Sequence, residues 1–193
     1  MKKLEDRIMQ DGRIIDNEIL KVDSFINHQI DCAMLRDISR HMRNKFENID
    51  KIVTIETSGI AFAVGVAMEY NDIPVVFAKK TGSKIMDNNN AYQSVVKSFT
   101  KGTVNNICID KRFLKKGERV LIVDDFLAEG NAALGLVDIL KQADCEVVGI
   151  AVCVEKRFQG GRQKLEGLGY KVYAAASIDA FVDGKPIFHR YSK

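Results

Sequence analysis

The chain contains 193 residues, of which 46% are hydrophobic and 28% are charged, and its formal net charge at pH 7 is +3. This length suits one domain, because typical domains hold roughly 100–200 residues, and the composition excludes a disordered or fibrous chain. The weak basic excess is spread along the sequence, which argues against nucleic acid as a partner. No apolar run approaches the roughly 20 residues that span a bilayer, and acidic Glu5 and Asp6 stand where a signal peptide would be apolar, so we expect a cytoplasmic protein without a membrane partner.

Cysteine and histidine, which often ligate metals or act in catalysis, form no functional pattern in this sequence. The cysteines have neither CxxC spacing nor nearby histidines, and two of them lie in apolar runs, so we expect buried thiols rather than metal ligands or disulfides. The histidines are scattered, and we assign none of them a catalytic role. The residues concerned are Cys32, Cys108, Cys145, Cys153, His28, His41 and His189.

The first half of the chain predicts helices and strands in alternation. Apolar residues recur every three or four positions from Met34 to Phe46, which is the spacing of one helix face. Two short apolar runs predict strands, and Ser58 with Gly59 opens the helix between them. The predicted elements are a helix to about Asn48, a strand at Lys51–Glu56, a helix from Ile60 to about Tyr70 and a strand at Pro74–Ala78.

The stretch from Lys79 to Asn90 has too little apolar content to pack, and we expect an exposed, mobile loop there. Strand-like sequence resumes at about Tyr92–Phe99 and again at Ile107–Ile109, with polar stretches between the two runs. This arrangement predicts an antiparallel excursion from the main sheet.

The second half of the chain holds the clearest buried strand, Arg119–Val123. Gly130 begins a helix that closes near Ala143, and the uninterrupted apolar run Val147–Val154 predicts a strand covered on both faces. Strands that alternate with helices at this spacing form parallel sheets with right-handed crossovers. Because no internal repeat or linker divides the chain, the sequence predicts a single doubly wound α/β domain over residues 1–193, with a central, mainly parallel sheet flanked by helices.

Polar residues mark the carboxyl ends of the predicted strands, where ligands bind in open parallel sheets. The strand at Arg119–Val123 delivers Asp124 and Asp125 and is followed by a glycine that opens a helix, whose free N–H groups and positive dipole end suit an anion. Carboxylates repel phosphate, so the acidic pair should bind hydroxyls, a cation or a developing positive charge, while the backbone from Ala128 to Ala132 binds a phosphate. This arrangement indicates a sugar phosphate ligand. The alternative is an acidic pair that only caps the helix or binds Mg²⁺ alone.

Residues 120–130 resemble the phosphoribosyl pyrophosphate (PRPP) signature of the type I phosphoribosyltransferases, which is an apolar strand followed by two acids, about three residues and Thr-Gly. The chain departs from the family at Glu129, where threonine is usual, and at Asn131, where a small or hydroxyl residue is usual. These departures remove a phosphate donor and add a negative charge near the anion unless Glu129 points away. Other segments are similar to the xanthine branch of the bacterial enzymes, so the resemblance covers nearly the whole chain. These segments are Leu20–Asp31, Ile55–Ile60, Ser98–Lys101 and Val154–Arg162.

The resemblance implies a type I phosphoribosyltransferase fold with a small hood, formed by residues 1 to about 34 and parts of 155–193. It also implies a purine salvage reaction that transfers the 5-phosphoribosyl group of PRPP to xanthine, with Mg²⁺ bound alongside the pyrophosphate and a homodimer as the working state. Two other interpretations stay open: a hypoxanthine-guanine or adenine phosphoribosyltransferase, and a purine-sensing transcriptional regulator of the same fold. The regulator would need a DNA-binding element, for which the amino-terminal segment is too short.

The same resemblance assigns roles to particular residues. Asp124 and Asp125 are the expected catalytic pair, which holds the ribose hydroxyls and stabilises positive charge at the anomeric carbon. No side chain is assigned as a metal ligand. Taken alone, the remaining residues also fit structural roles, such as a core position for Leu20 or a turn cap for Asn27. The expected binding residues are Ala128, Glu129, Gly130, Asn131 and Ala132 for the 5′-phosphate, Thr57, Ser58 and Gly59 for pyrophosphate, Lys79 and Lys80 in the mobile loop, and Leu20, Asn27 and Lys156 for xanthine.

Overall fold

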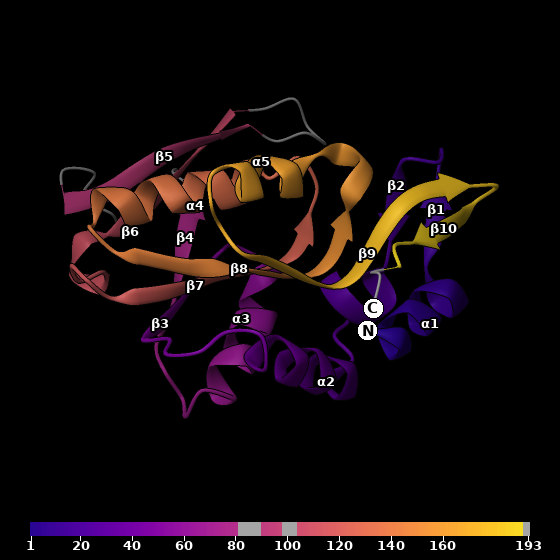
Figure 1. The fold of residues 1–193 in the computed structure, drawn as a ribbon, viewed down its shortest axis with the longest axis horizontal. Helices are drawn as coiled ribbons and strands as arrows, with labels where there is room; N and C mark the ends of the chain where they lie inside the picture. Colours follow the sequence, from indigo (N-terminus) through magenta and orange to yellow (C-terminus); the bar gives the residue numbers. More distant parts are fainter. Residues whose placement is uncertain (81–89, 98–103, 191–193) are drawn as a thin grey trace.

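The computed structural model describes residues 1–80, 90–97 and 104–190. Within these ranges an eight-stranded sheet runs through the molecule in the order β10-β9-β8-β7-β3-β4-β6-β5 (Figure 1). Strands β9, β8, β7, β3 and β4 are parallel, and antiparallel strands flank them at both edges. The prediction of a central, mainly parallel sheet is therefore confirmed. The strands are β3 (Lys51–Ile55), β4 (Val75–Lys80), β5 (Ala91–Lys97), β6 (Val104–Asp110), β7 (Arg119–Leu127), β8 (Glu146–Lys156), β9 (Val172–Val182) and β10 (Lys185–Phe188).

Helices cover both faces of this sheet, with α2 and α3 on one face and α4 and α5 on the other (Figure 1). Each face has its own buried apolar cluster. Side chains alternate along the central strand β7, so Leu121 and Val123 join the cluster beside α2 and α3, whereas Val120 and Ile122 join the cluster beside α4. Because both faces are covered, this strand is a continuous apolar run in the sequence. The helices are α2 (Cys32–Arg43), α3 (Gly59–Met68), α4 (Asn131–Gln142) and α5 (Gly161–Gly167).

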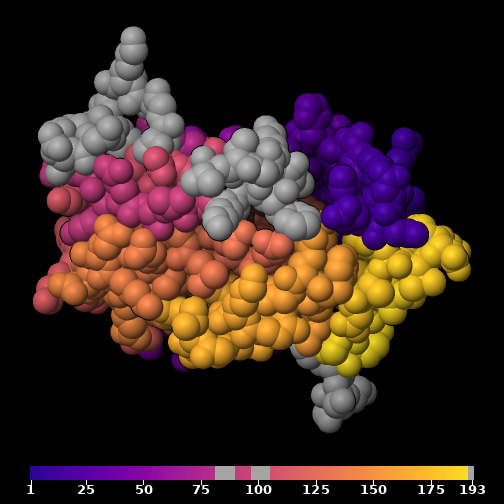
Figure 2. Space-filling model, turned by 90° about the horizontal axis from the view of Figure 1, so that it is seen from above, coloured from indigo at the N-terminus to yellow at the C-terminus, as the bar shows by residue number. Residues whose placement is uncertain are grey.

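The amino-terminal segment and the β9–β10 hairpin lie side by side at one end of the molecule, in the region where the hood is expected (Figure 2). Arg190 Nη1 bonds Glu5 Oε2 at 2.7 Å, which ties the two segments together. The β1–β2 pair forms its own small antiparallel sheet. No helix in the described ranges is long and apolar enough to cross a membrane. The remaining elements are α1 (Lys2–Asp11), β1 (Arg13–Ile15), β2 (Ile19–Lys21), a π-helical turn η1 (Asp23–Asn27) and two 3-10 turns, η3 (Lys111–Phe113) and η4 (Arg157–Gln159).

The first predicted helix is shorter than expected. Helix α2 ends at Arg43 rather than near Asn48, because the chain turns there: the Lys45 N–H donates to a carbonyl of the last helical turn, and Asn48 has a positive φ of 55°. Phe46 is still buried, and its carbonyl accepts a hydrogen bond from Tyr70 Oη at 2.8 Å. A turn rather than a helix therefore brings this apolar residue into the core.

Two strands extend beyond their predicted ends. Lys79 and Lys80 pair with β6, so they are strand residues and the prediction that they begin a loop is wrong. Strand β7 continues to Leu127 because its pairing with β8 runs through Asp124, which places the acidic pair inside the strand. The pairing of β5 with β6 confirms the antiparallel excursion. Most of the predicted loop, and Phe99 of the predicted strand, lie outside the described residues.

Candidate active site

A cavity of about 360 Å³ opens at the carboxyl ends of β3, β7 and β8. Its lining includes the acidic pair of β7 and the whole loop that leads from β7 into α4. Lys80, Lys156 and Gln159 add polar groups from β4, from β8 and from the turn after β8. The cavity therefore lies where ligands bind in open parallel sheets, and it combines acidic groups with a candidate anion site.

The acidic pair is buried at the floor of this site: Asp124 and Asp125 are each 9% exposed. The Asp125 N–H donates to Asp124 Oδ1 at 2.9 Å, and Asn27 Nδ2 donates to Asp125 Oδ2 at 3.5 Å. Burial, together with the charge of Asp125, raises the pKa of Asp124 well above its usual 3.8. Because charge is costly in such a place, the pair favours a ligand that brings hydroxyl donors, a cation or a developing positive charge.

Metal binding at the acidic pair would depend on the substrate. Among the described residues, no cluster of three or more acidic, histidine or cysteine side chains is placed to hold an ion. Mg²⁺ commonly binds through one or two carboxylates together with substrate phosphates. The residues present therefore fit an ion that arrives with a pyrophosphate-bearing substrate, and they do not form a cage that would hold Mg²⁺ alone.

The loop from Ala128 to Ala132 has the geometry of an anion site. Gly130 has a φ of +84°, a conformation that suits glycine, and it caps the amino terminus of the twelve-residue helix α4. The N–H groups at the start of α4 have no partner within the helix, and they lie beside the cavity. Asn131 Nδ2 donates to Glu129 Oε2 at 3.0 Å. The two residues that depart from the family pattern therefore bind each other, and an amide of the loop holds the Glu129 carboxylate.

Thr57 and Ser58 precede α3, and Gly59 is its first residue. A Cβ atom at Gly59 would lie 2.6 Å from Asp124 Oδ1 and still closer to Thr54 Oγ1, so a larger residue would displace one of them. In the described part of the chain, residues 57–59 are not in the cavity lining, although the preceding residue, Glu56, is. Gly59 therefore has a packing role beside the acidic pair.

The residues expected at the purine are only partly brought together. Lys156 lines the cavity, and its Nζ donates to the Glu18 carbonyl at 3.0 Å in the turn between β1 and β2. Burial lowers the pKa of Lys156. Asn27 reaches the site through its bond to Asp125, whereas Leu20 is buried in the apolar core and lies outside the lining that the described residues form.

Lys80, Glu56 and Gln159 show how the structure refines the predicted set. Of the predicted lysine pair, Lys80 lines the cavity and Lys79 does not, in the part of the chain that the structure describes. Glu56 and Gln159 also line it, although neither was among the predicted binding residues; Glu56 stands at a strand end that the sequence marks as polar. Both stand in segments that carried the family resemblance, which is the signal that would have identified them.

The cysteine prediction is correct for Cys108 and Cys153, which are buried in β6 and β8. It is wrong for Cys145, which is half-buried, and for Cys32, which is exposed because it begins α2 at the surface. No disulfide joins these residues, all of which lie in the described ranges.

An acidic pair and a glycine loop at the carboxyl edge of a parallel sheet fit an enzyme that acts on a sugar phosphate, and comparison with known proteins gives the family of this chain. Residues 25–167 match the phosphoribosyl transferase domain, so the chain belongs to this family and is a phosphoribosyltransferase. It is 48% identical over 191 residues to xanthine phosphoribosyltransferase 1 of Clostridium perfringens and 45% identical over 190 residues to xanthine phosphoribosyltransferase 2 of Clostridium botulinum. Both alignments cover 97% of this chain and 100% of the relative.

Solved structures of the family share the fold. The structure resembles APRTase from Giardia lamblia with a TM-score of 0.74 and 20% identity, over 90% of this chain and 97% of that one. It resembles adenine phosphoribosyltransferase from Rhodothermus marinus with a TM-score of 0.73 and 20% identity, over 92% of this chain and 100% of that one. The predicted type I phosphoribosyltransferase fold is therefore confirmed.

Proposed function

We propose that this phosphoribosyltransferase acts in purine salvage and transfers the 5-phosphoribosyl group of PRPP to N9 of xanthine, giving xanthosine 5′-monophosphate and pyrophosphate. The observation that carries the proposal is one cavity lining that holds a buried acidic pair, the glycine loop before α4 and Lys156 at the end of β8. The similarity to two relatives named xanthine phosphoribosyltransferase, over nearly the whole chain, supports the choice of base.

The acidic pair is proposed to act on the ribose. During transfer, the bond from C1′ to the pyrophosphate oxygen breaks and its electron pair leaves with pyrophosphate, while N9 of the purine forms the new bond and loses its proton. Positive charge develops on the ribose ring in the transition state. Asp124 and Asp125 would hold the 2′- and 3′-hydroxyls and stabilise that charge, which is worth more in a buried site than in water.

The phosphates are proposed to bind on either side of the acidic pair. The 5′-phosphate would bind the backbone of residues 128–132 at the start of α4, and pyrophosphate would bind near residues 57–59 with Lys79 and Lys80 nearby. When bound with PRPP, Mg²⁺ neutralises charge on the pyrophosphate. Most of the mobile loop expected from Lys79 to Asn90 lies outside the described residues.

Asn27 and Lys156 are proposed to distinguish xanthine from other purines. Xanthine has a carbonyl at position 2, where guanine has an amine and hypoxanthine has no substituent. A donor that faces this position gains a hydrogen bond from xanthine and loses its partner with the other bases. Asn27 Nδ2 and Lys156 Nζ are donors at the base side of the site, and Leu20 would support the pocket from the hood core.

The working unit is proposed to be a homodimer of single-domain chains, with residues 1–193 forming one phosphoribosyltransferase domain and its hood. On α3, Val64 is 45% exposed and Met68 is 66% exposed, and residues four apart share one helix face. A second copy would cover this apolar face. We propose a cytoplasmic location, with small molecules rather than nucleic acid or membranes as partners.

The direct test of function is product formation. Purified protein with PRPP, Mg²⁺ and xanthine is expected to release pyrophosphate and form xanthosine 5′-monophosphate, detected by liquid chromatography. The matched control is the double variant Asp124→Asn with Asp125→Asn, which keeps the shape of the site and removes both charges. Nucleotide formation with hypoxanthine, guanine or adenine but not xanthine would contradict the choice of base, and no nucleotide with any purine would favour a sensing role.

A further inference from the structure

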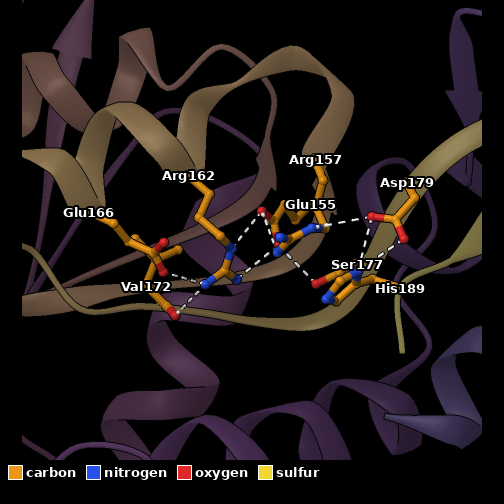
Figure 3. Close-up of polar contacts among 8 residues, drawn as sticks. All are labelled: Glu155, Arg157, Arg162, Glu166, Val172, Ser177, Asp179 and His189. Atoms are coloured by element: carbon orange, nitrogen blue, oxygen red, sulfur yellow. Dashed lines mark hydrogen bonds and ion pairs between the residues drawn. The ribbon is translucent and has the colours of Figure 1, made fainter. Parts of the chain in front are cut away.

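A buried ion pair lies outside the cavity and is not used in the proposed chemistry. Glu155, near the end of β8, is fully buried, and Arg162, in α5, is 7% exposed. Two parallel bonds join them: Arg162 Nε to Glu155 Oε1 at 2.7 Å and Arg162 Nη2 to Glu155 Oε2 at 2.8 Å (Figure 3). This fork fixes the orientation of both side chains, because planar guanidinium and carboxylate groups match at two points.

Neighbouring groups on β9 and on α5 itself hold the pair in place. Ser177 Oγ donates to Glu155 Oε2 at 2.8 Å, and Arg162 Nη1 donates to the Val172 carbonyl at 3.0 Å and to Glu166 Oε1 at 2.8 Å (Figure 3). Helix α5 is thereby attached to two strands of the sheet. A buried ion pair with this many partners is rigid, although it is not for that reason a source of stability.

The start of α5 also packs directly against the proposed 5′-phosphate loop. The Gly161 N–H donates to the Ala128 carbonyl at 3.0 Å, and Lys164 Nζ donates to the Glu129 carbonyl at 3.2 Å. A Cβ atom at Gly161 would lie 2.8 Å from the Gly130 nitrogen and closer still to the Ala128 oxygen. The backbone of the loop and the backbone of α5 are therefore in direct contact.

We propose that Arg162 and Glu155 are positioning residues that set the place of the 5′-phosphate loop by clamping α5 against it. The proposal rests on the proposed binding of the 5′-phosphate at residues 128–132, and it adds residues that do not touch the ligand. Loss of the fork would let α5 and the loop shift together, which would misplace the N–H groups that bind the phosphate. Affinity for the phosphate end should fall, while affinity for pyrophosphate should not.

The test uses the full-length protein with Glu155→Gln, which keeps the side-chain size, and Arg162→Lys, which keeps the charge but loses the fork. Ribose 5-phosphate is the probe, because it carries the 5′-phosphate and the diol but no purine. Its dissociation constant, measured by calorimetry where circular dichroism shows folded protein, is expected to rise about tenfold in both variants, as expected for one lost charge-assisted contact. The dissociation constant of magnesium pyrophosphate is expected to stay within about twofold of the wild-type value, a smaller change than the loss of one charge-assisted contact produces.

A second ion pair, far from the cavity, supplies the control. Buried Lys51 places its Nζ 2.5 Å from Oε2 of half-buried Glu118, and the two stand at the amino ends of β3 and β7, at the opposite end of these strands from the cavity. Glu118→Gln makes the same chemical change as Glu155→Gln. We expect it to lower the melting temperature without changing the affinity for ribose 5-phosphate.

The outcomes separate this inference from the choice of base. Three outcomes would each overturn the proposal. The first is an unchanged affinity for ribose 5-phosphate in both variants. The others are an equal loss of that affinity in Glu118→Gln, and an equal loss of affinity for magnesium pyrophosphate in the two variants. Failure of Glu155→Gln to fold would also overturn it, because the pair would then serve folding rather than positioning. A protein that prefers another purine would refute the proposed substrate but leave this measurement intact, because ribose 5-phosphate carries no base.

Discussion

Replacing Gly59 with alanine tests the link between the start of α3 and the acidic pair. The new Cβ atom would lie 2.6 Å from Asp124 Oδ1, so restoring an ordinary contact of 3.4 Å requires a displacement of about 0.8 Å. Thr54 Oγ1 would lie closer still to the new atom, so relieving the contact with Asp124 alone is not sufficient. A displacement of about 1 Å at a catalytic group typically costs about 100-fold in rate, or about 2.7 kcal/mol of transition-state stabilisation.

The assay for Gly59→Ala is kcat/KM for xanthine at saturating PRPP, with unfolding by urea as the measure of stability. Overpacking costs about 1–3 kcal/mol, which leaves a domain of ordinary stability folded. Gly167→Ala is the matched control, because its added Cβ would have no described atom within 4 Å apart from its chain neighbours and the backbone of its own helix. We expect this control to keep kcat/KM within about twofold, since an unobstructed alanine does not disturb its surroundings. A folded Gly59→Ala protein with nearly normal kcat/KM would refute the reasoning.

Three further predictions follow from the site. Asp124→Asn with Asp125→Asn should lower kcat about 100-fold or more, because the charges that stabilise the ribose are lost; turnover near the wild-type value would refute the catalytic assignment. Because the pKa of Asp124 is raised in the folded state, its contribution to stability is fully present below about pH 3.8 and is lost as the pH rises through the folded-state pKa. Asp124→Asn should therefore be more stable than wild type at pH 8, with a smaller difference at pH 5 in urea unfolding; a difference independent of pH would contradict the burial argument. Asn27→Ala should lower kcat/KM for xanthine about tenfold more than kcat/KM for guanine. Equal decreases for both bases would show that Asn27 shapes the pocket without a hydrogen bond to position 2 of the purine.

The central sheet and the acidic site were predictable because local patterns encode them. Val120 to Val123 are apolar without interruption, which is typical of a strand covered on both faces, and the acids that follow lie at the edge where ligands bind. Gly130 stands where a left-handed conformation is needed, and it caps α4 as expected. These features depend on neighbouring residues in the chain, so one sequence is sufficient to identify them.

The hood and the positioning pair depend on contacts between distant parts of the chain. Lys156 bonds the carbonyl of Glu18, which is 138 positions away, and no local pattern specifies that bond. The fork between Arg162 and Glu155 likewise requires α5 to fold back on β8. Leu20 is buried in the apolar core, and its contact with the base stays a prediction, since a buried hydrophobic residue has the same local signature in a core and in a pocket wall.

Errors at element ends have the same origin. Phe46 fits the helical spacing of α2, but tertiary packing rather than helix geometry buries it. Lys79 and Lys80 are polar and exposed like loop residues, yet β6 supplies the backbone partners that make them a strand. Exposed positions near the end of an internal strand accommodate charged side chains here, so composition alone does not distinguish such a strand from a loop.

The most direct test of the proposed function is a competition among purines for limiting PRPP. Equimolar xanthine, guanine, hypoxanthine and adenine are incubated with the enzyme and Mg²⁺, and the nucleotide products are separated and quantified. The ratio of two products equals the ratio of the kcat/KM values for the two bases. We expect xanthosine 5′-monophosphate to exceed each other nucleotide by about tenfold or more, which is the ratio that one well-placed hydrogen bond produces. A product mixture dominated by inosine or adenosine 5′-monophosphate would contradict this expectation.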